Sequence, residues 1–176
     1  DFVDFKGSVY GSAVDPQILR TPEAVKELIP EWPAIDPWRQ ILVGLDTGAN
    51  HPFGATKIVT TEKGLVVIGE YLERHRTFLE HAHSIKMLAA HPTPRYAINK
   101  NERQPMIELG QHGISCQPSE NDVVAGIERV KSWLHVKQLF FVEALCPLTI
   151  RQMKALRWAD TSTKDGQTRT EKVYKI

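Results

Sequence analysis

The sequence predicts an α/β domain with a mixed sheet, in which three antiparallel strands are followed by β-α units and flanked by helices. Apolar strand candidates at residues 41–46, 54–60 and 65–71 follow one another without an intervening helix. After residue 77, amphipathic helix patterns alternate with short apolar strands. A chain of 176 residues, of which 41% are hydrophobic, is long enough to bury one sizeable core.

Residues 1–40 are predicted to form a lead-in or linker segment packed on the domain, which occupies residues 41–176. Prolines interrupt any long element in this segment, at Pro16, Pro22, Pro30, Pro33 and Pro37. Thr21 is a favoured helix cap and precedes a proline and a glutamate, so a short helix is expected from there to Leu28.

The first strand, 41–46, is almost continuously apolar and ends at Thr47 and Gly48, which predicts a buried strand followed by a tight turn. The next two strand candidates are separated by four residues that end in Gly64, so they are expected to form a β-hairpin.

Thr77 and Glu80 have the spacing of a capping box and predict a helix to about Ala90. Short strands are expected at 95–99 and 114–117, with a helix at 104–109, and residues 139–142 are expected to form a final core strand or a packed segment. Ser119 is predicted to cap a helix that runs to Leu134, and Pro147 to begin a last helix that ends near Trp158.

The composition narrows the function classes. With 22 basic and 21 acidic residues the net charge is +1, below the basic excess of a free-standing nucleic-acid binder. No apolar run approaches the length of a membrane span and the first residues do not resemble a signal peptide, so we expect a soluble intracellular protein with no membrane partner. Cys116 and Cys146 have no Cys-x-x-Cys spacing and are expected to be reduced.

Asp46 is the main candidate for chemistry, because it lies at the carboxyl end of a strand and precedes a small turn. An ordinary turn would also place Asp46, Thr47 and Gly48 in this order. An aspartic protease would require an almost all-β chain, which the helix patterns contradict. An actin-like or sugar-kinase ATPase would require two large lobes, for which the chain has no room.

A fourth interpretation uses more of the chain: three antiparallel strands, a helix and then β-α units is the order of the ribonuclease-H-like fold. Further landmarks resemble the nuclease domain of viral large terminases, in the order found in that family. They are Gly7-Ser8-Val9-Tyr10, Gly44-Leu45-Asp46-Thr47-Gly48 with His51-Pro52-Phe53, Gly69-Glu70-Tyr71, Asn121-Asp122 with Gly126-Ile127, and Cys146-Pro147 before a helix that ends in Arg157-Trp158.

The resemblance implies a metal-dependent endonuclease that cuts concatemeric double-stranded DNA during genome packaging. Such enzymes use clustered carboxylates to hold two Mg²⁺ or Mn²⁺ ions about 4 Å apart. Asp46 would be the first ligand, and the family's second acid falls on Asn99, which offers a neutral oxygen only. Glu70 is an additional candidate ligand.

The family's third acid lies just beyond the segment that resembles residues 171–176, so the domain is expected to be truncated at its C-terminus. With one of three expected acids, this form is predicted to show little or no cleavage. A ribonuclease-H-like resolvase or transposase, and a catalytically silent DNA-binding module of the same fold, remain as alternatives.

Several basic residues border the predicted site or lie in the polar segment that follows residue 159, and are candidates for DNA contact: Arg74, Arg76, Lys100, Arg103, Lys164, Arg169 and Lys172. By resemblance, the partners are double-stranded DNA, the terminase motor (ATPase) domain, the small terminase and the portal, in the cytoplasm of the infected host cell. Tethering to the motor would let a nearly neutral domain bind DNA weakly.

Overall fold

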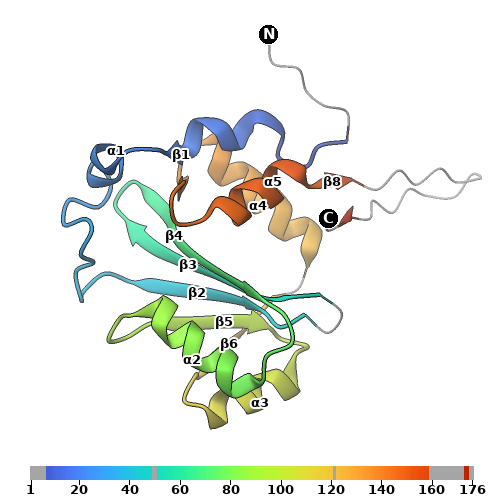
Figure 1. Ribbon diagram of the computed structural model, residues 1–176. Coiled ribbons are helices and arrows are strands. Elements are labelled where there is room, and N and C mark those ends of the chain that lie inside the picture. Colours follow the sequence, from blue (N-terminus) through green and yellow to red (C-terminus); the bar gives the residue numbers. More distant parts are fainter. Residues whose placement is uncertain (1–6, 49–50, 121, 159–172, 175–176) are drawn as a thin grey trace, which may run out of the picture.

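The computed structural model describes residues 7–48, 51–120, 122–158 and 173–174. One mixed sheet of seven strands lies between two layers of helices, so the predicted α/β class is confirmed (Figure 1). The strand order is β1-β7-β4-β3-β2-β5-β6. Within the described residues, no helix is long and apolar enough to cross a membrane.

The first part of the sheet has the predicted antiparallel order. Strand β2 (Ile41–Asp46) pairs with β3 (Phe53–Thr61), and β3 pairs with β4 (Gly64–Glu73). The predicted hairpin is therefore present, with longer strands than the sequence indicated. Gly64 has a φ of +141° at the start of β4, and a Cβ there would lie 2.3 Å from the carbonyl oxygen of Gln138, so the position requires glycine.

Parallel strands extend the sheet on both sides. Strand β5 (Arg95–Asn99) pairs with β2, and β6 (Cys116–Ser119) pairs with β5. On the other side, β7 (Leu139–Val142) pairs with β4, and β1 (Ile18–Leu19) pairs with β7. Strand β2 thus lies inside the sheet, with the antiparallel β3 on one side and the parallel β5 on the other.

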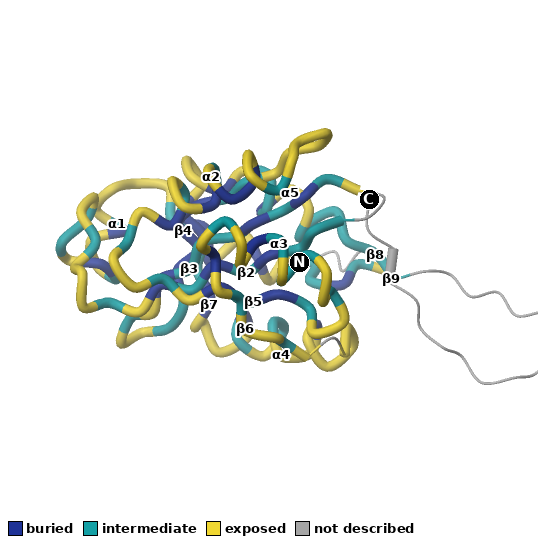
Figure 2. Tube along the Cα trace, turned by 90° about the horizontal axis from the view of Figure 1, so that it is seen from below, coloured by how far each residue is buried: buried dark blue, intermediate teal, exposed yellow. Residues whose placement is uncertain are grey.

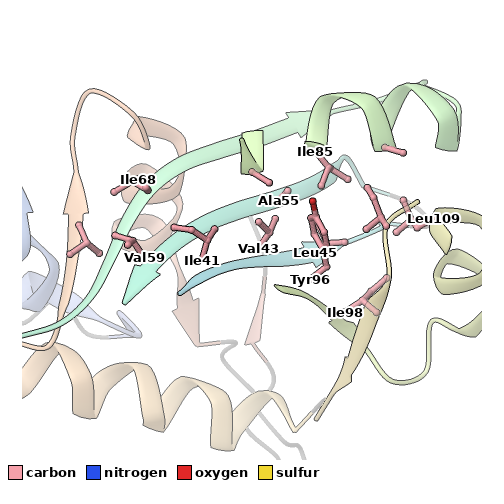
Figure 3. Close-up of a cluster of buried hydrophobic side chains, with 14 of the residues drawn as sticks. Ile41, Val43, Leu45, Ala55, Val59, Ile68, Ile85, Tyr96, Ile98 and Leu109 are labelled. Carbon is pink, nitrogen blue, oxygen red and sulfur yellow. The ribbon is translucent and has the colours of Figure 1, made fainter. Parts of the chain in front are cut away.

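One face of the sheet is covered by α2 (Phe78–Ala89) and α3 (Arg103–Gln111). Thr77 caps α2 in a capping box with Glu80, as predicted. The core beneath these helices contains Val43, Ile85 and Leu109, which converge between the sheet and the helices (Figure 3). Because alternate residues of a strand face opposite sides, this core fixes which side chains of β2 and β5 face the other layer.

The opposite face is covered by η1 (Gly11–Gln17), α4 (Val123–His135) and α5 (Pro147–Ala155). A second core there includes Val14, Leu134, Phe141 and Ile150. The short helix α1 (Pro22–Lys26) begins at the predicted cap, where the Thr21 side chain accepts a hydrogen bond from the amide of Ala24. Figure 2 shows buried segments along the strands and exposed residues on the outer turns of the helices.

Two predictions about helix ends are wrong. Ser119 is the last residue of β6, and its hydroxyl donates to the Ile98 carbonyl; Asp122 caps α4 instead, accepting from the amide of Ala125 at 2.9 Å. The last helix ends at Ala155, because the chain becomes extended in β8 (Arg157–Trp158), which pairs with β9 (Val173–Tyr174).

Candidate metal site at two neighbouring strand ends

Asp46 and Asn99 are the last residues of β2 and β5, two neighbouring parallel strands. Leu45 is in register with Ile98, so the next residue of each strand lies beside the other. Leu45 and Ile98 are buried in the core under α2 and α3, which turns the half-buried Asp46 and Asn99 toward the opposite face. The structure therefore brings these two predicted site residues together.

The Asp46 side chain is 47% exposed, so its carboxylate is accessible to an ion from solvent. The exposed imidazole of His51 lies beside this carboxylate, with its Nε2 3.8 Å from Oδ1. That contact is an ion pair only when the imidazole is protonated, since a neutral ring carries no charge. A half-exposed carboxylate at a strand end is a suitable first ligand for a hard cation.

The side chain of Asn99 is already used in a turn. Its Oδ1 accepts a hydrogen bond from the amide of Asn101 at 2.9 Å, and its carbonyl accepts from the amide of Glu102 at 2.9 Å. An amide oxygen has two lone pairs, so one remains for another partner. Asn99 can therefore contribute a neutral oxygen beside Asp46.

Glu102 is a carboxylate at this strand end that the sequence reasoning missed. It occupies the N-cap position of α3, and its Oε2 accepts a hydrogen bond from the hydroxyl of Thr47, the residue that follows Asp46. An acid just before a helix is common for local electrostatic reasons, so its position in the sequence gave no signal of this contact.

Glu70 lies on the same face of the sheet but away from Asp46. It is opposite Thr56, which is opposite Gly44, so it is two strands from β2 and hence about 10 Å away. Its carboxylate accepts hydrogen bonds from the amides of Leu148 at 2.9 Å and Thr149 at 2.6 Å. The structure places Glu70 at the N-terminus of α5 and does not bring it to the other candidate ligands.

Two of the predicted DNA-contacting residues line a hollow that includes the residues just after Asp46, but not Asp46 or Asn99. Arg74 and Arg76 are exposed and line a hollow of about 360 Å³ that also includes Thr47, Gly48 and His51. Arg76 is 3.6 Å from the carboxylate of Glu80.

The other predicted contacts differ in their surroundings. Lys100 donates a 2.6 Å hydrogen bond to Glu120, and Arg103 is exposed on the first residue of α3. Lys164, Arg169 and Lys172 lie outside the described residues. Arg103 follows Asn99 by only four positions, so its charge lies close to the candidate metal site along the chain.

The inner wall of the hollow is formed by aromatic rings around the buried His81. Phe53 stacks on the His81 ring with centroids 4.3 Å apart, and the Tyr71 hydroxyl is 2.8 Å from its Nδ1. Burial lowers the pKa of His81 and raises the pKa of Tyr71, so both side chains are favoured in their neutral forms. His81 is thus a packing residue in the wall of the hollow that Arg74 and Arg76 also line.

The donor atoms at the strand ends suit Mg²⁺ or Mn²⁺, because they are carboxylate and amide oxygens. No group of three or more His, Cys, Asp or Glu side chains in the described part of the chain could hold a metal ion. The set formed by Asp46 and Asn99 therefore fits a weakly held hard cation, with its remaining ligands supplied from elsewhere or by water.

Neither a protein-family model nor a curated protein sequence matches the chain, whereas solved structures do. A large terminase from a thermophilic bacteriophage is 17% identical, with a TM-score of 0.76 over 97% of this chain. The chain spans only 42% of that terminase. The P22 large terminase nuclease domain is 11% identical, with a TM-score of 0.73 over 97% of this chain and 84% of its own.

Two further nuclease domains were solved with a metal ion. The large terminase nuclease from thermophilic phage G20c with bound magnesium is 15% identical, with a TM-score of 0.66 over 96% of this chain and 88% of its own. The nuclease domain from bacteriophage SPP1 with bound Mn is 17% identical, with a TM-score of 0.60 over 83% of this chain and 81% of its own. At these identities the likeness shows the fold. The chain has the ribonuclease-H-like fold of the large terminase nuclease domains.

Proposed function

We propose that the chain is the metal-dependent endonuclease domain of a viral large terminase, which cuts concatemeric double-stranded DNA during genome packaging. The observation that carries this proposal is the position of Asp46 and Asn99 at the ends of two neighbouring parallel strands, in a fold whose solved relatives hold magnesium and manganese. Strand ends of α/β sheets are where such folds gather their chemistry.

The proposed cofactor is a pair of Mg²⁺ or Mn²⁺ ions, which would supply Lewis-acid activation of the phosphodiester and of water. Asp46 would provide the negatively charged ligand. Asn99 would provide a neutral oxygen in the place of the second acid, which lowers the attraction for a cation. We therefore propose that cleavage by this form is impaired.

We propose that DNA contacts the exposed side chains of Arg74, Arg76 and Arg103. Lys100 would contribute after leaving Glu120, an exchange that costs little because both side chains are largely exposed. Lys164, Arg169 and Lys172 remain proposed contacts on the grounds of charge alone.

With a net charge of +1 the domain would bind DNA weakly by itself. We propose that attachment to the terminase motor (ATPase) domain raises the local concentration of DNA, and that the small terminase and the portal complete the assembly in the host cytoplasm. The match to less than half of one thermophilic-phage large terminase is consistent with such an additional domain.

A catalytically silent DNA-binding module of the same fold is the second candidate. The neutral Asn99 favours it, as does the lack of a three-residue metal cluster among the residues that the structure describes. Plasmid nicking in Mn²⁺ separates the two candidates. If the Asn99→Asp variant nicks plasmid and the Asn99→Asp/Asp46→Ala double variant does not, the nuclease is supported. If the Asn99→Asp variant binds DNA without nicking it, the silent module is supported.

The metal site is tested by Mn²⁺ titration calorimetry on the wild type, Asp46→Ala and Glu62→Ala. Glu62 is an exposed acid in the β3–β4 turn, at the opposite end of β3 from the partner of Asp46, and controls for the loss of a surface charge. We expect weak binding by the wild type and by Glu62→Ala, and none by Asp46→Ala. Equal binding by Asp46→Ala and the wild type would contradict the site.

A further inference from the structure

We propose that Glu102 is a positioning residue for Asp46 and acts through the hydroxyl of Thr47. This inference rests on the proposed metal site. Asp46 is the last residue of β2 that has a partner in the sheet, and Thr47 lies just beyond the paired register. The hydrogen bond from the Thr47 hydroxyl to Oε2 of Glu102 joins the chain after β2 to the connection between β5 and α3.

The turn after β5 directs Glu102 toward this contact. The amide of Glu102 donates to the carbonyl of Asn99, and the side chain of Asn99 accepts from the amide of Asn101, both at 2.9 Å. This double closure reverses the chain within four residues. Asn99 and Glu102 are therefore held by one compact turn, and the carboxylate of Glu102 reaches the neighbouring strand end.

A local role in helix capping does not account for the Glu102 side chain. Glu102 is the N-cap residue of α3, but its side chain makes no capping hydrogen bond to that helix. The N-caps of α1, α2 and α4 differ, since the side chains of Thr21, Thr77 and Asp122 each accept from a backbone amide of their own helix. The Glu102 carboxylate is directed away from its own helix and onto Thr47.

The contact has consequences for metal binding because Asp46 supplies the only charge of the Asp46–Asn99 pair. A hydrogen bond to an ionised carboxylate is stronger than one between neutral groups, so it restricts Thr47 more than an ordinary hydroxyl contact would. Gly48, which follows, has a φ of +53°, a conformation that favours glycine. Holding Thr47 limits the motion of the Asp46 backbone and so preorganises its carboxylate.

The test compares Glu102→Ala and Thr47→Val, which remove the hydrogen bond, with Glu102→Gln and Thr47→Ser, which can keep it. Mn²⁺ affinity is measured by titration, and backbone hydrogen exchange of residues 44–48 is measured without metal. We expect Glu102→Ala and Thr47→Val each to weaken Mn²⁺ binding about tenfold, the range typical of groups that orient a ligand. The double variant should lose no more than either single one.

The conservative variants decide the mechanism. Thr47→Ser should keep the wild-type affinity and slow exchange, because a serine hydroxyl donates the same hydrogen bond. Glu102→Gln should keep most of both, because its amide oxygen accepts that bond without the added strength of the charge. If Glu102→Gln loses as much affinity as Glu102→Ala, the positioning role is overturned, and the carboxylate of Glu102 instead acts on the metal through its charge. Unchanged exchange in Glu102→Ala would also overturn the proposal. If the wild type binds no Mn²⁺, the proposed function fails, and exchange alone decides whether Glu102 holds Thr47.

Discussion

At the scale of single residues, Asp46 and Asn99 occupy equivalent positions on neighbouring strands and differ in charge. Both end a parallel strand, both are half-buried, and both face away from the core under α2 and α3. Affinity for a divalent cation depends strongly on how many ligands are charged. Asn99, with its neutral amide, is therefore the residue that most limits metal binding in the proposed site.

Replacement of Asn99 by aspartate should strengthen Mn²⁺ binding by about tenfold or more, because it adds a charged ligand beside Asp46. The turn should survive, since an aspartate oxygen also accepts from the amide of Asn101. Titration calorimetry measures the change. Asn101→Asp, an exposed substitution in the same turn, is the matched control and should have a smaller effect. Equal affinities for Asn99→Asp and the wild type would show that Asn99 is not at the metal.

At the scale of elements, helix α5 is joined to the sheet by Glu70. Its carboxylate accepts from the first free amides of the helix, at Leu148 and Thr149, where the helix dipole favours a negative charge. Cys146, just before the helix, is buried and donates to the carbonyl of Val142. Burial, together with the charge of Glu70, raises the pKa of the Cys146 thiol to about 12, so it stays protonated.

Glu70→Ala should lower the free energy of unfolding by about 1–3 kcal/mol, because it leaves two partly buried amides without their acceptor. Urea unfolding measures this change, and Glu62→Ala, a substitution in a surface turn, should stay within about 0.5 kcal/mol of the wild type. If Glu70 serves α5 alone, the variant keeps its Mn²⁺ affinity at temperatures where it is folded. A loss of affinity with no loss of stability would instead restore Glu70 as a metal ligand.

At the scale of the whole molecule, the described part of the lead-in contributes to both cores. Val25 and Ile29 are buried with the residues under α2 and α3, and Val14 is buried with those under α4 and α5. Strand β1 extends the sheet beside β7. We therefore propose that residues 7–40 fold as part of the domain.

Ile29→Ala should destabilise the protein by about 2–5 kcal/mol, the range for truncating a fully buried isoleucine. Ile41→Ala, in strand β2, is an equally buried reference and should cost a similar amount. Trp38, in the same lead-in but 94% exposed, provides the control, since Trp38→Ala should change little. Denaturant unfolding of all three variants checks this. A negligible effect of Ile29→Ala would mean that the lead-in is only a linker.

Much of the fold could be predicted from the sequence because its signals are local. The strands at 41–46, 95–99 and 139–142 have the predicted bounds, since apolar runs flanked by turn residues specify them. The capping box at Thr77 specifies the start of α2 in the same way. The local signal at Ser119 gave a wrong prediction. A serine is a favoured helix cap, but Ser119 pairs with Asn99 and is the last residue of β6.

The sequence by itself determined the order of strands and helices and placed Asp46 at a strand end, because these depend on residues within a few positions of one another. Only the tertiary structure decided which side chains share that end. The pairing of β2 with β5 brings Asn99 to Asp46, and the turn after β5 brings Glu102 to Thr47. Strand β3 separates Glu70 from β2, and the carboxylate of Glu70 binds the first amides of α5. Each of these contacts joins residues far apart in the chain, and no local preference encodes such a pairing.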